Sequence, residues 1–250
     1  MGFTRVAVLR LAVVAGLAGA LEAACRLGAI PRTSVIPPSD MALALSEVLI
    51  ERRVLEGLGE TFGSVLIAFA LAVSCGIGGG LVIHALPLLR RAVSPLLAAW
   101  YAIPHFAFYP LFIVLLGLGR ASLVALALML SGAAMTIATL DGLDRERRVL
   151  TKQARIYRLG TAARIRLIRL PAALPHLIGG LKLAFVYSFI GVIAGEFILS
   201  TSGLGHEISY AYDNFETRRM YGLILLTLVL AVSINLGFRA YERRLARVQG

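Results

Sequence analysis

The chain has 250 residues, of which 58% are hydrophobic and only 16% are charged, and its formal net charge is +11 at pH 7. A soluble domain is about half apolar and about a quarter charged. This composition, with a mean hydropathy of +0.82, therefore excludes an ordinary soluble protein. A basic chain can bind nucleic acid, but arginine and lysine also gather in the cytoplasmic loops of membrane proteins. The long apolar runs predict a polytopic membrane protein that binds the lipid bilayer and no nucleic acid.

The chain begins with an apolar run, Val6–Ala24, that is long enough for a first transmembrane helix. Its basic start also resembles a signal peptide, but Glu22 and the later spans favour a helix that is retained. Pro31–Asp40 is rich in turn residues and is expected to lie outside the membrane. Met41–Gly59 has apolar and charged residues at helical spacing, which predicts an amphipathic surface helix.

Further apolar spans and a second external segment follow, and together they predict an all-α fold with about six transmembrane helices. The spans are Thr61–Leu89, Val93–Gly119, Ser122–Leu140, Leu174–Leu199 and Tyr221–Phe238, with the external segment at Gly203–Met220. The glycines of Cys75–Gly80 follow no strand and precede no Lys-Ser/Thr pair, so they indicate close helix packing rather than a phosphate loop. Small residues from Ser131 to Thr139 indicate the same for the fourth span.

Two features inside the spans are candidates for the solute pathway. The third span carries Pro104 and Pro110, which interrupt helical hydrogen bonds and predict a kink. His105 and Tyr109 lie at that kink, where they either face the solute or pack in the core. Glu196 is a carboxylate inside the fifth span; such groups are costly and often functional, but this one could instead fix the outer end of its span.

The most charged stretch is Asp144–Pro171, which lies between the fourth and fifth spans. Its alternating apolar and basic residues predict two short amphipathic helices separated near Gly160–Thr161. A basic amphipathic segment of this length lies on a membrane surface or docks on another protein. One alternative is that the segment serves only as a positive-inside topology signal.

Several motifs resemble the permease subunits of ABC importers, and in particular the sulfonate, taurine and nitrate type. They are Ile168-x-Leu170-Pro171, Gly179-Gly180-Leu181-Lys182-Leu183-Ala184, Gly191 to Phe197, and Ser202-Gly203-Leu204-Gly205. The resemblance implies a type I importer permease fold over residues 37–250, after an N-terminal helix and external turn in residues 1–36. It also implies that residues 143–171 form the loop that couples the permease to a cytoplasmic ATPase.

This coupling loop departs from the family pattern. Lys152, Gln153 and Ala154 occupy the positions of the family's Glu-Ala-Ala, and Arg158 occupies the position of its glycine, so Gly160 is expected to supply the turn. The set that the resemblance assigns to ATPase coupling is Lys152, Gln153, Ala154, Arg155, Ile156, Tyr157, Arg158, Leu159, Gly160, Ile168, Leu170 and Pro171.

The resemblance further implies a set of partners. These are a cytoplasmic ABC ATPase dimer, a second permease subunit (a homodimer is expected) and an external or periplasmic substrate-binding protein. The chain has no nucleophile–base pair, metal cluster or phosphate loop, so it is expected to be no enzyme and to bind no cofactor. ATP and magnesium would be bound by the ATPase. The expected solute is small and anionic, but sulfonate, taurine, nitrate and a pyrimidine precursor all remain open.

Orientation follows from the basic residues. Six spans place both termini on one side, and the side that holds the loop around Arg155 also holds most arginines, so both termini are predicted to be cytoplasmic in the inner membrane. Two other functions stay open: the structural half of a heterodimeric permease, which Lys152 and Arg158 suggest, and a secondary transporter or channel.

Overall fold

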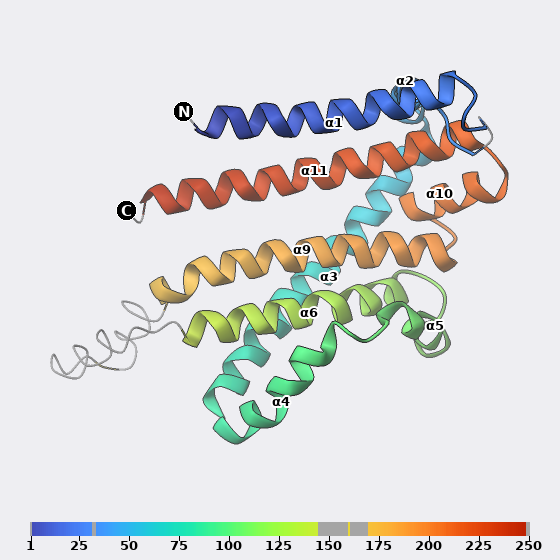
Figure 1. Cartoon of the computed structure of the whole chain (residues 1–250). Coiled ribbons are helices and arrows are strands. Elements are labelled where there is room, and N and C mark those ends of the chain that lie inside the picture. The colour runs from blue at the N-terminus through green and yellow to red at the C-terminus, as the bar shows by residue number, and fades with distance from the viewer. Residues whose placement is uncertain (1, 32–33, 145–159, 161–169, 249–250) are drawn as a thin grey trace.

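The structure is a computed structural model that describes residues 2–31, 34–144, 160 and 170–248 (Figure 1). These ranges consist of helices joined by turns and contain no strand, as the all-α prediction required. The helices are α1 (Gly2–Arg26), α2 (Pro38–Val48), α3 (Arg52–Ala85), α4 (Pro87–Trp100), the 3-10 helix η1 (His105–Phe108), α5 (Tyr109–Leu116), α6 (Arg120–Asp144), α9 (Leu170–Leu199), α10 (Leu204–Asp213) and α11 (Thr217–Val248).

The long helices run between two ends of the molecule (Figure 1). At the end that we call the loop end, α6 stops at Asp144, α9 begins at Leu170, and the two chain termini lie nearby. At the opposite end, which we call the α10 end, lie α2, α10 and the start of α11. Within the described residues, five helices are long and apolar enough to cross a membrane, and the bent pair formed by α4 and η1–α5 makes a sixth candidate. The prediction of about six spans is confirmed.

The core is the contact of α6 with α3 on one side and with α9 on the other. Glycines allow the close approach: a Cβ at Gly76 or Gly80 of α3 would lie 2.5 Å from Met135 or 2.7 Å from Thr139 of α6. A Cβ at Gly180 of α9 would likewise lie 2.5 Å from Ala138. Small residues at helix contacts let the backbones approach closely. Membrane helices gain van der Waals energy from such packing, because lipid provides no hydrophobic driving force for their association. The packing interpretation of both glycine and small-residue runs is therefore confirmed.

The prediction of a single surface helix over Met41–Gly59 was wrong. α2 ends at Val48, and α3 begins at Arg52 after Glu51 adopts an extended backbone. The turn between them separates two helices, and α3 continues without interruption into the apolar span that we expected to begin at Thr61. A sequence pattern that is helical on both sides of a short turn does not reveal the turn.

The second span also ends earlier than Leu89. Leu86 is extended, with φ −113° and ψ 96°, because it precedes Pro87, and a residue before proline is disfavoured in the helical region. Pro87 then starts α4, so Arg90 and Arg91 lie inside a new helix rather than after the old one. Pro87 occupies the first helical turn, where its missing N–H costs nothing.

The third span is broken, as its prolines predicted, but it is not one helix over Val93–Gly119. α4 and the η1–α5 pair make an angle of 99° across a short break. Pro104 precedes η1, and Pro110 lies in the first turn of α5, so both prolines mark helix starts. α6, α9 and α11 extend beyond the predicted fourth, fifth and sixth spans, and α10 lies within the segment that we expected to be external.

The first helix lies at the edge of the bundle and joins it near the α10 end. Its apolar side chains, among them Leu11 and Leu17, are exposed in the isolated chain. Glu22 accepts hydrogen bonds from the N–H and hydroxyl of Ser39 at the start of α2, at 3.0 and 2.7 Å, and from Arg26 at 2.5 Å. α1 is thus fastened at one end, and its remaining surface suits lipid.

Candidate functional site

Glu196 is a buried carboxylate at the point where α9, α3 and α10 meet near the α10 end. The hydroxyl of Thr61 lies 2.9 and 2.8 Å from its two oxygens and donates to them. The N–H of Gly205 donates to Oε2 at 3.0 Å, and the N–H of Leu204 donates to the Thr61 hydroxyl at 2.8 Å. The first N–H groups of a helix lack partners within it, so Thr61 and Glu196 satisfy those of α10. This set of contacts, which we call the Glu196 latch, joins three helices.

The glycines of the Ser202–Gly205 motif make room for the latch. Gly203 has φ 100°, which favours glycine, and a Cβ there would overlap the Glu196 carboxyl group. A Cβ at Gly205 would overlap the carbonyl oxygen of Ile193 in α9. The motif therefore turns the chain tightly from α9 into α10 and places α10 directly against the carboxylate.

A small polar cavity of about 180 Å³ borders the latch. It is lined by residues from α3, α6, α9 and the turns beside them, which supply two carboxylates, one guanidinium and four hydroxyl groups. The lining residues are Glu60, Ser64, Gly119, Arg120, Leu123, Glu196, Ser200, Thr201 and Ser202. Glu196 is therefore buried in the described chain yet lies beside space that is large enough for water or a small polar group.

The break in the third span lies against the outer part of α9. The hydroxyl of Tyr109 donates to the carbonyl oxygen of Leu199 at 2.7 Å, which fastens the start of α5 to the end of α9. The His105 ring packs 5.4 Å from the Trp100 ring, and its Nε2 is buried without a partner among the described residues. Tyr109 and Glu196 thus belong to one region at the end of α9. Pro104 belongs to the same region through its backbone, because η1 begins directly after it.

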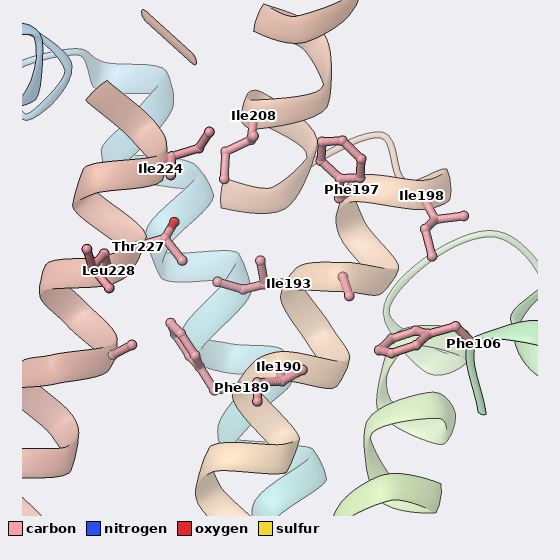
Figure 2. A pocket seen from close by; sticks show the side chains of 12 residues that line it. Phe106, Phe189, Ile190, Ile193, Phe197, Ile198, Ile208, Ile224, Thr227 and Leu228 are labelled. Carbon is pink, nitrogen blue, oxygen red and sulfur yellow. The ribbon is translucent and has the colours of Figure 1, made fainter. Parts of the chain in front are cut away.

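An apolar groove of about 710 Å³ runs along the outer half of α9 (Figure 2). Its walls come from α9, α10 and α11, and Phe106 of η1 closes one side. Thr227 supplies the single hydroxyl of the lining, and that hydroxyl already donates to the carbonyl of Leu223 at 3.0 Å. The groove suits apolar contacts and offers no charge to an anion.

At the loop end, an ion pair joins α4 to the last residue of α6. Arg90 donates through both guanidinium Nη atoms to the two Asp144 oxygens, with Nη1 to Oδ1 at 2.7 Å. His84 of α3 also approaches, with Nδ1 3.5 Å from Asp144 Oδ1. Three helices therefore converge on Asp144, the point where the chain enters the predicted coupling loop.

Most of the coupling residues lie outside the described residues: Lys152, Gln153, Ala154, Arg155, Ile156, Tyr157, Arg158, Leu159 and Ile168. Gly160 is exposed, and Leu170 and Pro171 form the first turn of α9. The predicted two amphipathic helices and the role of Gly160 as their turn remain predictions.

Several functional candidates were missed by the sequence analysis. Thr61 was taken only as the start of a span, yet it is the partner of Glu196; no local signal marks a contact between residues that are 135 positions apart. The Arg90–Asp144 pair was missed for the same reason. Lys182, inside the predicted fifth span, lies 4.0 Å from Glu242 of α11, a second contact between helices that the sequence did not reveal.

Comparisons with known proteins agree with this fold. Residues 64–247 match the family described as "Binding-protein-dependent transport system inner membrane component". The taurine transport system permease protein TauC of Escherichia coli (strain K12) is 24% identical over 84% of this chain and 76% of its own length. The riboflavin transport system permease protein RibX of Chloroflexus aurantiacus is 33% identical over 64% of this chain and 59% of its own length.

A solved structure has the same arrangement of helices. An inward-facing conformation of the MetNI methionine ABC transporter superposes with a TM-score of 0.65 and 18% identity, over 76% of this chain and 94% of that one. At this identity the likeness shows the fold, which is that of type I ABC importer permeases.

Proposed function

Because the chain belongs to the family of binding-protein-dependent inner-membrane transport components, we propose that it forms the translocation pathway of an ATP-driven importer for a small anionic solute. The membership itself makes the chain a permease subunit that works with an ATPase and a binding protein. The proposal adds the solute class, a homodimeric arrangement and the residues that couple and gate the pathway.

The observation that carries the coupling proposal is the geometry around the loop. α6 and α9, which flank the loop, share the most extensive helix contact in the described chain, and Gly180 and Gly191 bring their backbones together. A force applied to residues 145–169 therefore acts on two helices that move together, because packed helices transmit displacement rather than absorb it. In this proposal, closure of the ATPase dimer moves the loop and switches the pathway between inward-open and outward-open states.

The coupling proposal is tested at Tyr157, which the sequence pattern predicts to share an apolar face with Ile156 and Leu159. Burial of one such side chain contributes roughly 1.5–3 kcal/mol, which corresponds to about 10- to 150-fold in affinity. Tyr157→Asp should therefore weaken ATPase binding to the permease by at least about tenfold. The measurement is the affinity of the purified ATPase for the reconstituted permease.

A second variant tests whether the charge at position 152 alone determines coupling to the ATPase. Lys152→Glu restores the residue typical of the family, but it should not improve coupling, because the cognate ATPase must already accommodate a cation. Improved solute-stimulated ATP hydrolysis with Lys152→Glu would contradict this. If Tyr157→Asp keeps both binding and stimulation, the loop is a topology signal only.

We further propose that the Glu196 latch is the outer gate of the pathway. The latch joins α10 to α9 and α3 beside a polar cavity, so its release would weaken the attachment of α10 to both helices. His105 and Tyr109 belong to the same region through the Tyr109–Leu199 hydrogen bond. Glu196→Gln keeps the side-chain size and should lower solute uptake while membrane insertion and ATPase binding remain. Unchanged uptake would leave Glu196 a structural residue.

The orientation and the subunit arrangement are tested separately. Both termini and Arg155 are proposed to be cytoplasmic, so a cysteine at Asp213 should react with an impermeant reagent added to intact cells, whereas one at Arg155 should not. Two differently tagged copies of this chain should co-purify with one ATPase dimer. Co-purification with a second, different permease instead would identify the chain as half of a heterodimer, and uptake without ATP would identify a secondary transporter.

A further inference from the structure

Phe215 is the most exposed of the large apolar side chains in the described residues, with 90% of its surface accessible. It lies in the turn between α10 and α11. That turn is at the far edge of the α10 end (Figure 1). α11 begins two residues later, at Thr217, so Phe215 lies beyond the membrane-crossing part of that helix. An isolated exposed apolar residue needs no explanation, but this one also has an unusual backbone.

Phe215 has φ 58°, and it is the only residue other than glycine with positive φ among those described. Its N–H donates to the carbonyl of Tyr212, and the N–H of Glu216 donates to the carbonyl of Ala211 at 2.9 Å. These two bonds form the helix-ending motif whose left-handed position glycine usually occupies. A bulky side chain in that conformation is strained, so glycine would suit the fold better. Within the described residues, neither packing nor backbone geometry benefits from the ring, which points to a use outside the chain.

A groove of about 510 Å³ adjoins Phe215, and its rim is rich in carboxylates. Arg218 pairs with Glu47 at 3.0 and 2.6 Å, and Arg219 pairs with Glu51 at 2.9 Å and with Glu207 at 2.6 Å. The two guanidinium charges are thus taken by acids of the chain itself. The lining residues are Ile36, Glu47, Val48, Glu51, Phe215, Glu216, Thr217, Arg218 and Arg219.

Arg219 also lies 3.6 Å from Glu216, so these two arginines face four carboxylates of the chain. Asp213, on the other side of Phe215, is exposed as well, and the surplus charge around the ring is therefore negative. This surplus disfavours insertion into anionic lipid headgroups and favours a partner with basic side chains. Aromatic anchors that enter an apolar pocket on the partner supply most of the affinity in protein interfaces.

We propose that Phe215 and this groove dock the external substrate-binding protein, which would present an apolar pocket surrounded by lysine or arginine. The docking surface rests on the proposed function, since it requires the α10 end to face outward. Phe215 would enter the pocket, and the surplus negative charge, including Asp213 and Glu216 beside the ring, would meet the surrounding cations. Because α10 belongs to the Glu196 latch, a protein docked here would act directly on the outer gate.

The test uses the full importer in lipid vesicles and the binding protein whose addition supports its ATP-driven uptake. Phe215→Gly relieves the backbone strain, so the thermal unfolding midpoint should stay equal or rise while the affinity for the binding protein falls at least tenfold. Leu88→Ala is the matched control, because Leu88 is 82% exposed but lies near the loop end. It should leave that affinity unchanged. Added salt should weaken binding to the wild-type importer.

Equal binding-protein affinity for Phe215→Gly and wild type would overturn the proposal. A spin label at Phe215→Cys gives a second measurement, made in a Cys75→Ser background because Cys75 is the exposed cysteine. The label should be reached by a water-soluble relaxation agent and shielded when the binding protein is added. Access from the lipid phase would instead make Phe215 a membrane anchor and overturn the proposal. If wild type shows no uptake with any binding protein, the proposed function fails rather than this docking surface.

Discussion

The two ends of the molecule are held by different kinds of contact. At the α10 end, the Glu196 carboxylate and the Thr61 hydroxyl join α3, α9 and α10, and both side chains are buried. At the loop end, the Arg90–Asp144 pair joins α4 to α6 with side chains that are 33% and 40% accessible. Buried polar contacts are costly to break, whereas exposed ion pairs contribute little to folding. We therefore expect the α10 end to determine stability and the loop end to determine coupling.

The largest expected effect breaks the α10 end. Glu196→Ala removes the acceptor for the Thr61 hydroxyl and the Gly205 N–H, and each buried group left unpaired costs about 1–3 kcal/mol. The free energy of unfolding should therefore fall by about 2–6 kcal/mol, measured by denaturant unfolding of the purified permease. Glu60→Ala is the control, because Glu60 lines the same cavity but is exposed. A similar small loss in both variants would show that the latch does not determine stability.

The next effect concerns the turn that carries the latch. Gly203→Ala forces a non-glycine residue to φ 100° and places its Cβ on the Glu196 carboxyl group. Strain and overpacking of this kind typically cost about 1–3 kcal/mol. Gly59→Ala is the matched control, since a Cβ at Gly59 meets no atom within 4 Å. It should not lower the free energy of unfolding measurably. Equal unfolding midpoints for the two variants would contradict the geometry of the turn.

A smaller effect on stability is expected at the loop end. Arg90→Gln should lower the free energy of unfolding by less than about 1 kcal/mol, because the pair is partly solvated. It should nevertheless reduce solute-stimulated ATP hydrolysis, since Asp144 lies where α6 ends and the predicted coupling loop starts. Arg91→Gln serves as the control, because Arg91 is exposed beside it. A large loss of stability, or unchanged coupling, would remove the contrast between the two ends.

The smallest effect is a pH dependence at the surface of the α10 end. The hydrogen bonds from Arg218 hold the pKa of the Glu47 carboxyl below its ordinary value of 4.5. A lowered pKa in the folded state means that this pair stabilises the fold above the ordinary value and loses its effect as the pH falls through the lowered one. Glu47→Gln should therefore unfold at a slightly lower temperature than wild type at neutral pH. In acid the two midpoints should coincide, and a difference that persists there would contradict the prediction.

The sequence predicted the parts of the fold that depend on local pattern. The apolar runs predicted the transmembrane spans. Gly76, Gly80 and the small residues of α6 predicted the helix contacts, because close packing needs small side chains at helical spacing. The prolines predicted the break before α5. Leu86 before Pro87 was a readable signal for the end of α3 that the sequence analysis did not use.

The candidate site was predictable only in part. Glu196 stood out because a carboxylate in an apolar span is rare. Its partner Thr61 and the Arg90–Asp144 pair could not be found, since which helices meet is decided by packing over the whole chain. The strain at Phe215 was equally hidden, because an Asp-Asn-Phe-Glu sequence does not say which residue takes the left-handed position.

The chain has a single tryptophan, Trp100, at the last residue of α4. Its indole N–H donates to the carbonyl of Met129 in α6 at 3.0 Å, and its ring faces His105 across the break in the third span. Indole fluorescence depends on both the hydrogen bond and the neighbouring imidazole. The permease therefore contains an intrinsic optical reporter, and its emission, followed in the unlabelled protein during ATP turnover, would show when α4 moves against α6.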